Sequence, residues 1–219
     1  MKRLPVVVLL ALALAGCGTV KTSGTATLWI TRDRGARVLL TRTVPAGLTA
    51  MQALKRAREV DTRYGGRYVQ SIGGIAGSLS ARQDWFYFVN GIEADRSAAE
   101  YRLRPGDVEW WDYRSWRRQM RVPSVIGAFP EPFLHGYDGK VRPAVVVGTG
   151  TGARALARLV HGRVAATAPE RANVLRLVHG AARFTARLRP GGGVEFLYGG
   201  DPMRLARHPS MFRFRYEAR

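Results

Sequence analysis

The chain has 219 residues, of which 46% are hydrophobic, enough for one large or two small packed domains. It holds 35 Lys and Arg against 16 Asp and Glu, a formal net charge of +19. The excess is spread evenly, without a basic block or a known nucleic-acid-binding module, so we expect no nucleic-acid partner. Cys17 is the only cysteine, which excludes an internal disulfide and a zinc site built from cysteines.

The N-terminus has the layout of an export signal. Met1 to Arg3 is basic, and Leu4 to Ala15 is an apolar run too short to span a bilayer. The run ends in Leu14-Ala15-Gly16-Cys17, which resembles the lipobox of bacterial lipoproteins. The resemblance implies a signal peptide over residues 1–17, a lipidated Cys17 and an extracytoplasmic protein anchored in the cell membrane. The alternative is an ordinary secretory signal with an accidental cysteine.

Residues 18–24 are small and polar and predict a short tether. Residues 25–120 then show the period-two alternation of strands, interrupted by one helix. That helix is predicted to start at Thr49, because Gln52 stands at the capping-box spacing. The predicted strands are Thr25–Ile30, Val38–Val44, Arg67–Ile72, the aromatic stretch Asp84–Gly91, which enters an Asn-Gly hairpin turn, and Val108–Tyr113.

Four short motifs occur in order in this region: Val44–Leu54, Tyr68–Ile75, Trp85–Gly91 and Leu103–Trp110. Together they resemble a domain family of unknown function that also forms the C-terminal β-domain of transcobalamin and intrinsic factor. The resemblance implies a β-grasp fold over residues 25–120 and a cobalamin-like small molecule as a possible ligand. Those vitamin carriers clamp the corrin against a large helical barrel, and nothing in this chain is long enough to be that barrel.

The ligand could contact either the glycine-rich loop Ser71–Gly77 or the aromatic strand that follows it. The loop has no bulky side chain for a core, so it is either a ligand contact or a plain tight turn. Trp85 and Tyr87 are strand aromatics, which usually fill a core. The candidate ligand-binding residues are Ser71, Gly73, Gly74, Trp85, Tyr87 and Asn90.

Residues 121–143 are rich in proline and glycine but carry Phe129 and Phe133, which predicts an ordered connector. Residues 144–219 predict a small α/β domain in the order β-α-β-α-β-β, and the whole chain is therefore α+β. The two predicted helices of this domain end in Arg-Leu-Val-His, and a glycine follows each of them. The predicted elements are strand Ala144–Val147, helix Arg154–His161, strand Val164–Thr167, helix Arg171–His179, and strands Phe184–Leu188, Val194–Tyr198 and Met211–Tyr216.

No motif for a nucleophile elbow, a zinc protease, a kinase or a P-loop is present, so no catalytic residue and no enzyme activity are predicted. Gly148–Ala153 matches the dinucleotide fingerprint G-x-G-x-x-A, with Glu170 at the spacing of a ribose-binding acid. The alternative is a glycine-rich strand-to-helix turn. His161 and His179 each precede a glycine, which favours helix ends over metal ligands. We expect no metal and no resident cofactor.

The combined interpretation is a membrane-anchored extracytoplasmic lipoprotein with a non-catalytic module that binds a small ligand. The competing interpretation is an envelope scaffold or adhesion protein that uses its basic surface to bind anionic surface polymers or lipid. A third possibility is an exported enzyme.

Overall fold

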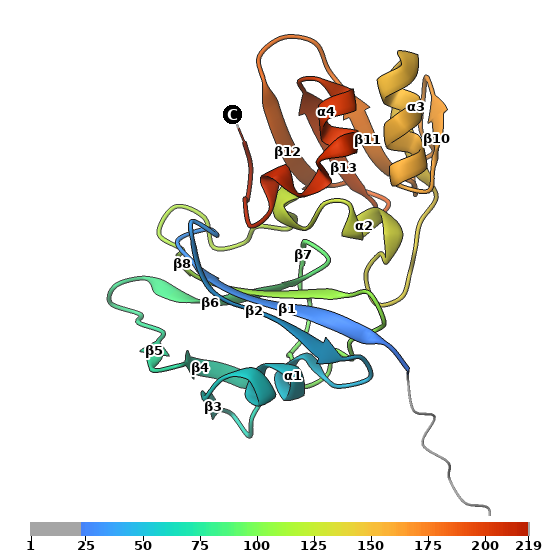
Figure 1. Ribbon diagram of the computed structural model, residues 1–219. Helices are drawn as coiled ribbons and strands as arrows, with labels where there is room; N and C mark the ends of the chain where they lie inside the picture. The colour runs from blue at the N-terminus through green and yellow to red at the C-terminus, as the bar shows by residue number, and fades with distance from the viewer. Residues whose placement is uncertain (1–22, 219) are drawn as a thin grey trace, which may run out of the picture.

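Alternating apolar residues and β-branched or aromatic side chains build the first of two five-stranded sheets, with strand order β2-β1-β8-β6-β7 (Figure 1). The computed structural model describes residues 23–218, so the predicted signal peptide and Cys17 lie outside the described residues. The parallel pair β1 and β8 forms the centre of the sheet, and the other pairings are antiparallel. The strands are β1 (Thr25–Arg32), β2 (Arg37–Pro45), β6 (Gln83–Val89), β7 (Ile92–Glu93) and β8 (Val108–Ser115).

One face of this first sheet packs against helix α1 (Ala50–Ala57) and a three-stranded sheet. The predicted capping box is confirmed, since the backbone N–H of Gln52 donates to Thr49 Oγ1 and the backbone N–H of Thr49 donates to Gln52 Oε1. The buried side of α1 places Leu54 in a core with Trp85 and Trp111. The small sheet comprises β3 (Val60–Arg63), β4 (Tyr68–Ile72) and β5 (Ile75–Ala76).

The second five-stranded sheet has the order β10-β9-β11-β13-β12, with β12 as its antiparallel edge strand. Helices α3 (Gly150–Leu159) and α4 (Pro202–Arg207) pack on it, and Phe129 and Phe133 of the connector enter its core. The connector carries the short helices η1 (Ile126–Ala128) and α2 (Glu131–Leu134). The strands are β9 (Ala144–Val147), β10 (Arg163–Ala165), β11 (Asn173–Leu177), β12 (Arg183–Leu188) and β13 (Val194–Gly199).

The C-terminal tail, residues 213–218, returns from the second sheet to the free face of the first. Tyr216 is buried there, edge-on to both Phe88 and Trp110, with ring centroids 5.5 Å apart in each pair. The hydroxyl of Tyr216 donates to Asp112 Oδ2 at 2.9 Å. The first sheet is thus covered on both faces. The division into residues 25–120, 121–143 and 144–219 stays a prediction, because the tail belongs to both packed regions.

The predicted α+β class is confirmed, but two elements of the second half are wrong. Residues 171–179 form strand β11 instead of a helix, because they pair with β9 and β13 on either side. Residues 211–216 do not form a strand: η2 (Pro209–Phe212) ends there, and Phe214 has a φ of +64°. Helix α4 was not predicted, although Asp201 caps it and Pro202 stands at its first turn.

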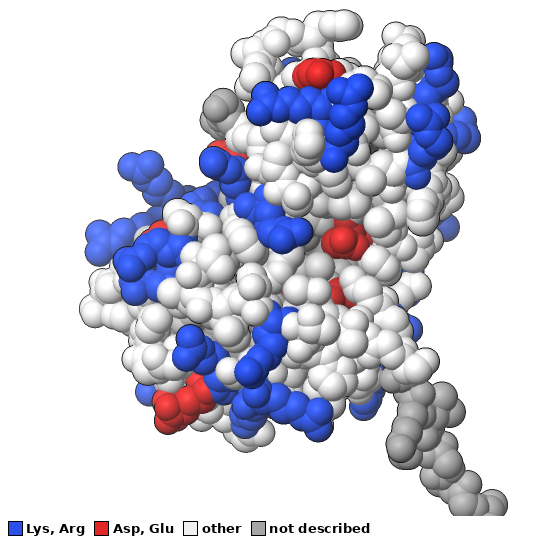
Figure 2. Space-filling view, in the orientation of Figure 1, with Lys and Arg blue, Asp and Glu red and all other residues white. Residues whose placement is uncertain are grey.

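The strand-rich fold leaves most charged side chains at the surface, and the visible face carries many more Lys and Arg than Asp and Glu (Figure 2). A few acidic side chains are buried instead, and one of them lies in the core between the first sheet and α1. Glu109 is fully buried, and its Oε1 accepts a hydrogen bond from Trp111 Nε1 at 2.5 Å. Its Oε2 has no hydrogen-bond partner among the described residues. Burial raises the pKa of Glu109 well above its ordinary value.

We predict that Glu109→Gln stabilises the fold at neutral pH. The unfolded chain releases the Glu109 proton near its ordinary pKa of about 4.3, whereas the folded chain holds it to higher pH. Glu109 therefore does not reduce the free energy of unfolding below about pH 4.3, the unfolded pKa, and reduces it increasingly as the pH rises towards the folded pKa. The amide removes this loss, with a gain of about 1–3 kcal/mol at pH 8 and a flatter pH dependence.

Urea unfolding from pH 4 to pH 8 would measure this effect. The matched control is Glu100→Gln, which changes a carboxylate of which 41% of the side chain is exposed, and it should alter stability by less than about 0.5 kcal/mol. Equal stability of Glu109→Gln and the parent chain at both pH values would contradict the argument.

Candidate functional site

The predicted ligand loop is a tight turn between β4 and β5. Gly73 and Gly74 have φ angles of +55° and +78° and are exposed, with open space beyond them. Ser71 is buried at the end of β4, and its hydroxyl donates to Asp61 Oδ2 at 2.5 Å. The glycines therefore provide the positive φ angles of the turn, while Ser71 joins two strands of the small sheet.

Trp85 and Tyr87 both point to the core side of β6. Trp85 is 6% exposed, and its Nε1 donates to the carbonyl of Ile75 at 2.7 Å. Tyr87 stacks on Trp111 at a centroid distance of 4.8 Å, and its hydroxyl donates to the carbonyl of Arg96. The two rings border a small hollow of about 170 Å³. Ligand pockets usually span about 300–1,000 Å³, so this hollow is too small for a sizeable ligand.

Asn90 is fully buried and has a φ of +51°, as the predicted hairpin turn requires. Its Nδ2 donates to Asp107 Oδ1 and to the carbonyl of Gly136, both at 2.8 Å. Its Oδ1 accepts from the backbone N–H of Val108 at 2.8 Å. Both amide hydrogens are used within the chain, and the residue joins the β6–β7 turn to β8 and the connector. The six predicted residues therefore do not converge on one site.

A larger hollow lies beyond the end of the glycine-rich loop, between the β3–β4 turn and the segment before β6. We call it the tyrosine hollow, and its volume is about 550 Å³. Tyr64 and Leu79 stand at its rim with 77% and 83% of their surface exposed. The rings of Tyr64 and Tyr68 meet edge-on at 6.1 Å. Its lining residues are Arg63, Tyr64, Tyr68, Gln70, Gly77, Ser78, Leu79, Ser80 and Asp84.

The carboxylate of Asp84 organises the polar side of the tyrosine hollow. It accepts a hydrogen bond from the hydroxyl of Tyr68, and its Oδ1 accepts from the backbone N–H of Trp85 at 2.8 Å. A Cβ on Gly77 would lie 2.5 Å from Asp84 Oδ1, so a larger residue there would displace this carboxylate. Burial and the hydrogen bond to Asp84 raise the pKa of Tyr68 to about 12. Tyr68 therefore remains a neutral donor at physiological pH.

Arg63 and Gln70 supply the remaining long polar side chains of the tyrosine hollow. Within residues 23–218, neither side chain has a hydrogen-bond or ion-pair partner. Their guanidinium and amide groups are available to a ligand. The hollow thus combines apolar rings with a fixed carboxylate and uncommitted donors, the mixture that small-molecule sites use.

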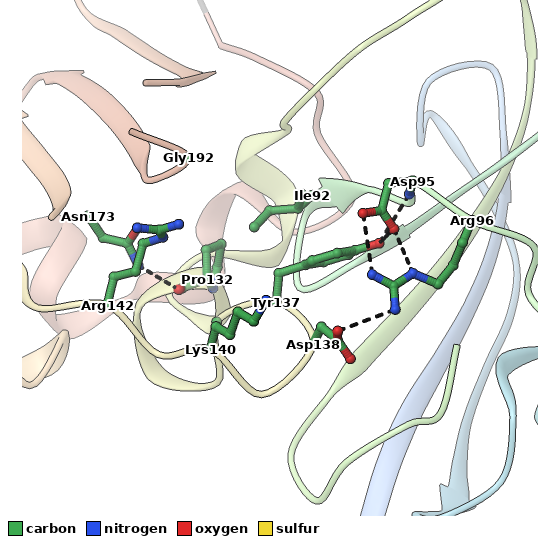
Figure 3. Close-up of a pocket in the computed structure, with 11 residues that line it drawn as sticks. Ile92, Asp95, Arg96, Pro132, Tyr137, Asp138, Lys140, Arg142, Asn173 and Gly192 are labelled. Atoms are coloured by element: carbon green, nitrogen blue, oxygen red, sulfur yellow. Dashed lines mark hydrogen bonds and ion pairs between the residues drawn. The ribbon is translucent and has the colours of Figure 1, made fainter. Parts of the chain in front are cut away.

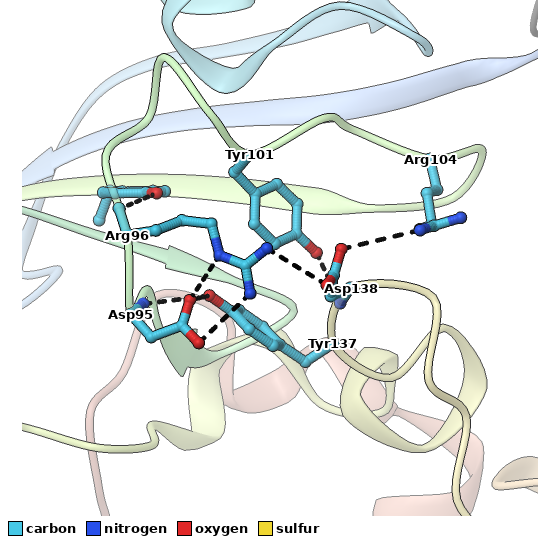
Figure 4. Close-up of polar contacts among 7 residues, drawn as sticks. Asp95, Arg96, Tyr101, Arg104, Tyr137 and Asp138 are labelled. Carbon is cyan, nitrogen blue, oxygen red and sulfur yellow. Dashed lines mark hydrogen bonds and ion pairs between the residues drawn. The ribbon is translucent and has the colours of Figure 1, made fainter. Parts of the chain in front are cut away.

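A second pocket, of about 190 Å³, lies between the first sheet and the second (Figure 3). Its polar groups bind one another. Arg96 contacts Asp95 Oδ1 at 2.8 Å and Asp138 Oδ2 at 3.3 Å, and Tyr137 donates its hydroxyl to Asp95 Oδ1 at 2.7 Å (Figure 4). The hydrogen bond from Arg96 is the main reason that the pKa of Asp95 is lowered. We interpret this network as a contact that holds the connector to the first sheet.

Two of the three glycines of the dinucleotide-like motif make close contacts within the chain, while Gly150 has a φ of +82° and open space beside it. A Cβ on Gly148 would lie 2.8 Å from Leu177 Cδ1, and a Cβ on Gly152 would lie 2.7 Å from Pro202 Cβ. The N-terminal turn of α3 therefore packs against α4. In residues 23–218 there is no group of three His, Cys, Asp or Glu side chains that could hold a metal ion. No helix in this part of the chain is long and apolar enough to cross a membrane.

Residues 47–115 match the family model of a domain of unknown function, DUF4430. This agrees with the predicted resemblance to such a domain family, and the matched segment contains every residue that lines the tyrosine hollow. No curated protein matches the sequence.

Two solved structures are similar in part. Haptocorrin in complex with Cbi has a TM-score of 0.34 and 18% identity, over 42% of this chain and 25% of that one. A putative metal binding protein from Ruminococcus gnavus ATCC 29149 has a TM-score of 0.33 and 11% identity, over 42% of this chain and 98% of that one. The similar region therefore spans about a quarter of the haptocorrin chain.

Tyr64, Leu79 and Asp84 were not among the predicted site residues. Two of them carried a usable signal. Leu79 is a single apolar residue inside the polar run Gly77–Ser80, and Tyr64 directly precedes the two glycines Gly65 and Gly66. A large apolar residue in a polar turn has no core to enter, so its exposure could have been anticipated.

We predict that Asn90→Ala lowers the free energy of unfolding and that its effect is on the fold, not on a ligand contact. The change leaves the N–H of Val108 and the carbonyl of Gly136 unpaired and puts alanine at a positive φ, at a cost of about 2–5 kcal/mol. Urea unfolding would measure it. Gln70→Ala is the control, since that amide has no partner, and it should cost less than about 0.5 kcal/mol. Equal stability of the two variants would contradict the structural role of Asn90.

Proposed function

We propose that this protein is a membrane-anchored extracytoplasmic lipoprotein whose tyrosine hollow binds a small ligand without catalysis. One observation carries the proposal: Tyr64 and Leu79 are 77% and 83% exposed at the rim of a hollow of about 550 Å³. Large apolar side chains gain about 25 cal/mol for each Å² that is removed from water, so a ligand that covers them binds favourably. The volume lies within the usual range for ligand pockets, unlike those of the two smaller hollows described above.

The lining indicates the chemistry of the ligand. The tyrosine rings suit a flat apolar face, Asp84 suits a donor, and Arg63 and Gln70 suit carbonyl or carboxylate groups at the edge of that face. A corrin, a flat macrocycle surrounded by amide groups, has this character, and the four sequence motifs motivate it as the first ligand to test. We also propose a β-grasp arrangement for the first sheet, since α1 packs across the parallel pair β1 and β8.

The ligand is tested by titrating the full-length protein in detergent with cobinamide and with cobalamin, followed by absorbance. We expect binding in the micromolar range or tighter. Tyr64→Ser and Leu79→Ser should each weaken it at least tenfold without changing the melting temperature, because both side chains are exposed. Val141→Ser is the control, since Val141 is 57% exposed and lies outside the hollow. Absence of binding at high micromolar concentration would exclude a corrin as the ligand. Binding that neither variant weakens would exclude the tyrosine hollow as the binding site.

The lipid anchor is tested by Cys17→Ala. The lipobox-like ending predicts that Cys17 carries the lipid, so the variant should move from the membrane fraction to the soluble fraction and lose incorporation of labelled palmitate. The control is Gly18→Ser, just beyond the lipobox, which should change neither the membrane location nor the incorporation of palmitate. A Cys17→Ala protein that still incorporates labelled palmitate would show that Cys17 is not the site of lipid attachment.

A further inference from the structure

The C-terminal tail and the β1–β2 turn form a second large hollow, and three arginines line it. Gly35 allows this contact, because a Cβ there would lie 1.6 Å from the carbonyl oxygen of Phe214. The hollow has a volume of about 490 Å³ and is lined by Arg34, Gly35, Ala36, Val38, Arg213, Phe214, Arg215, Tyr216 and Glu217. We call it the arginine hollow. Lys and Arg side chains gather on this side of the molecule, where the β1–β2 turn meets the C-terminal end (Figure 2).

The guanidinium groups of Arg34, Arg213 and Arg215 donate no hydrogen bond within residues 23–218. None of them forms an ion pair in the part of the chain that the structure describes. Arginines elsewhere differ: Arg176 contacts Glu195 at 2.9 Å. Three like charges in one hollow repel one another, and an anion that enters it relieves this repulsion.

Contacts with buried aromatic rings hold Arg34 and Arg213 in place before any ligand arrives. The Arg34 guanidinium lies over the Tyr216 ring at 4.6 Å, and that of Arg213 lies over the Trp29 ring at 5.7 Å. Tyr216 in turn donates to the buried Asp112. A side chain that is already ordered loses less entropy on binding, so the site is partly organised for its ligand.

We propose that the arginine hollow binds the phosphate groups of an anionic polymer. The planar fork of a guanidinium matches phosphate oxygens in pairs, and three forks accommodate more than one negative charge. The three exposed arginines surround a concave surface, which a flexible chain can follow more closely than a flat bilayer surface can. The carboxylate of Glu217 also lines the hollow and opposes an anion there. The proposal is independent of the tyrosine hollow.

The probe is fluorescently labelled inorganic polyphosphate, with anisotropy measured on the full-length protein in detergent from 50 to 200 mM salt. The triple variant Arg34→Gln, Arg213→Gln, Arg215→Gln should weaken binding at least thirtyfold and lower the salt dependence by about two to three released counterions. The matched control is Arg154→Gln, Arg158→Gln, Arg163→Gln, which removes the same charge from α3 and β10 and should change affinity less than threefold. Thermal melting shows that each variant is folded.

Two further measurements keep the test decisive. Glu217→Gln should tighten polyphosphate binding about two- to threefold, and this does not depend on the triple variant being folded. Vesicles of phosphatidylglycerol should compete with polyphosphate only weakly. Equal losses in the two triple variants would show binding by net charge alone and overturn the proposal. So would the absence of binding at 50 mM salt, or vesicles that compete as well as polyphosphate itself.

Discussion

The carboxylate of Asp112 connects three distant parts of the chain. It accepts hydrogen bonds from Thr31 Oγ1 at 2.6 Å, from the backbone N–H groups of Arg34 and Gly35 at 3.1 Å each, and from Tyr216 at 2.9 Å. Burial raises the pKa of Asp112, and these donors oppose that rise. Four donors around one buried acceptor fix the β1–β2 turn and the tail relative to β8, and an apolar residue at this position would leave the backbone N–H groups of the turn and the hydroxyl of Tyr216 without this acceptor.

Strand β8 explains why the two large hollows lie apart. Its side chains alternate, so Glu109 and Trp111 face α1 while Trp110 and Asp112 face the tail. Each face is covered by its own aromatic cluster. The hollows therefore form where loops meet at the margins of the packed layers, and the sheet serves as the rigid support that places those loops.

Local signals predicted the first half of the fold well. The capping box at Thr49 and the turn at Asn90 depend on residues a few positions apart, and both are present. The second half depends on distant partners. The sequence Arg-Leu-Val-His-Gly occurs twice, starting at Arg158 near the end of helix α3 and at Arg176 near the end of strand β11. The second copy belongs to a strand because residues 173–177 pair with β9 on one side and β13 on the other. For the same reason, Arg34 and Arg213 could not be placed together: their proximity depends on the path of the tail.

The return of the tail brings the end of the described chain back to the sheet in which the chain began. The first sheet leads through the connector to the second, and the last residues come back to Trp110 and Phe88 beside the first strand. A fragment that stopped at the connector would leave the rings of that face without the tail that covers them. Proteolytic shortening at the C-terminus would thereby loosen the opposite end of the molecule as well.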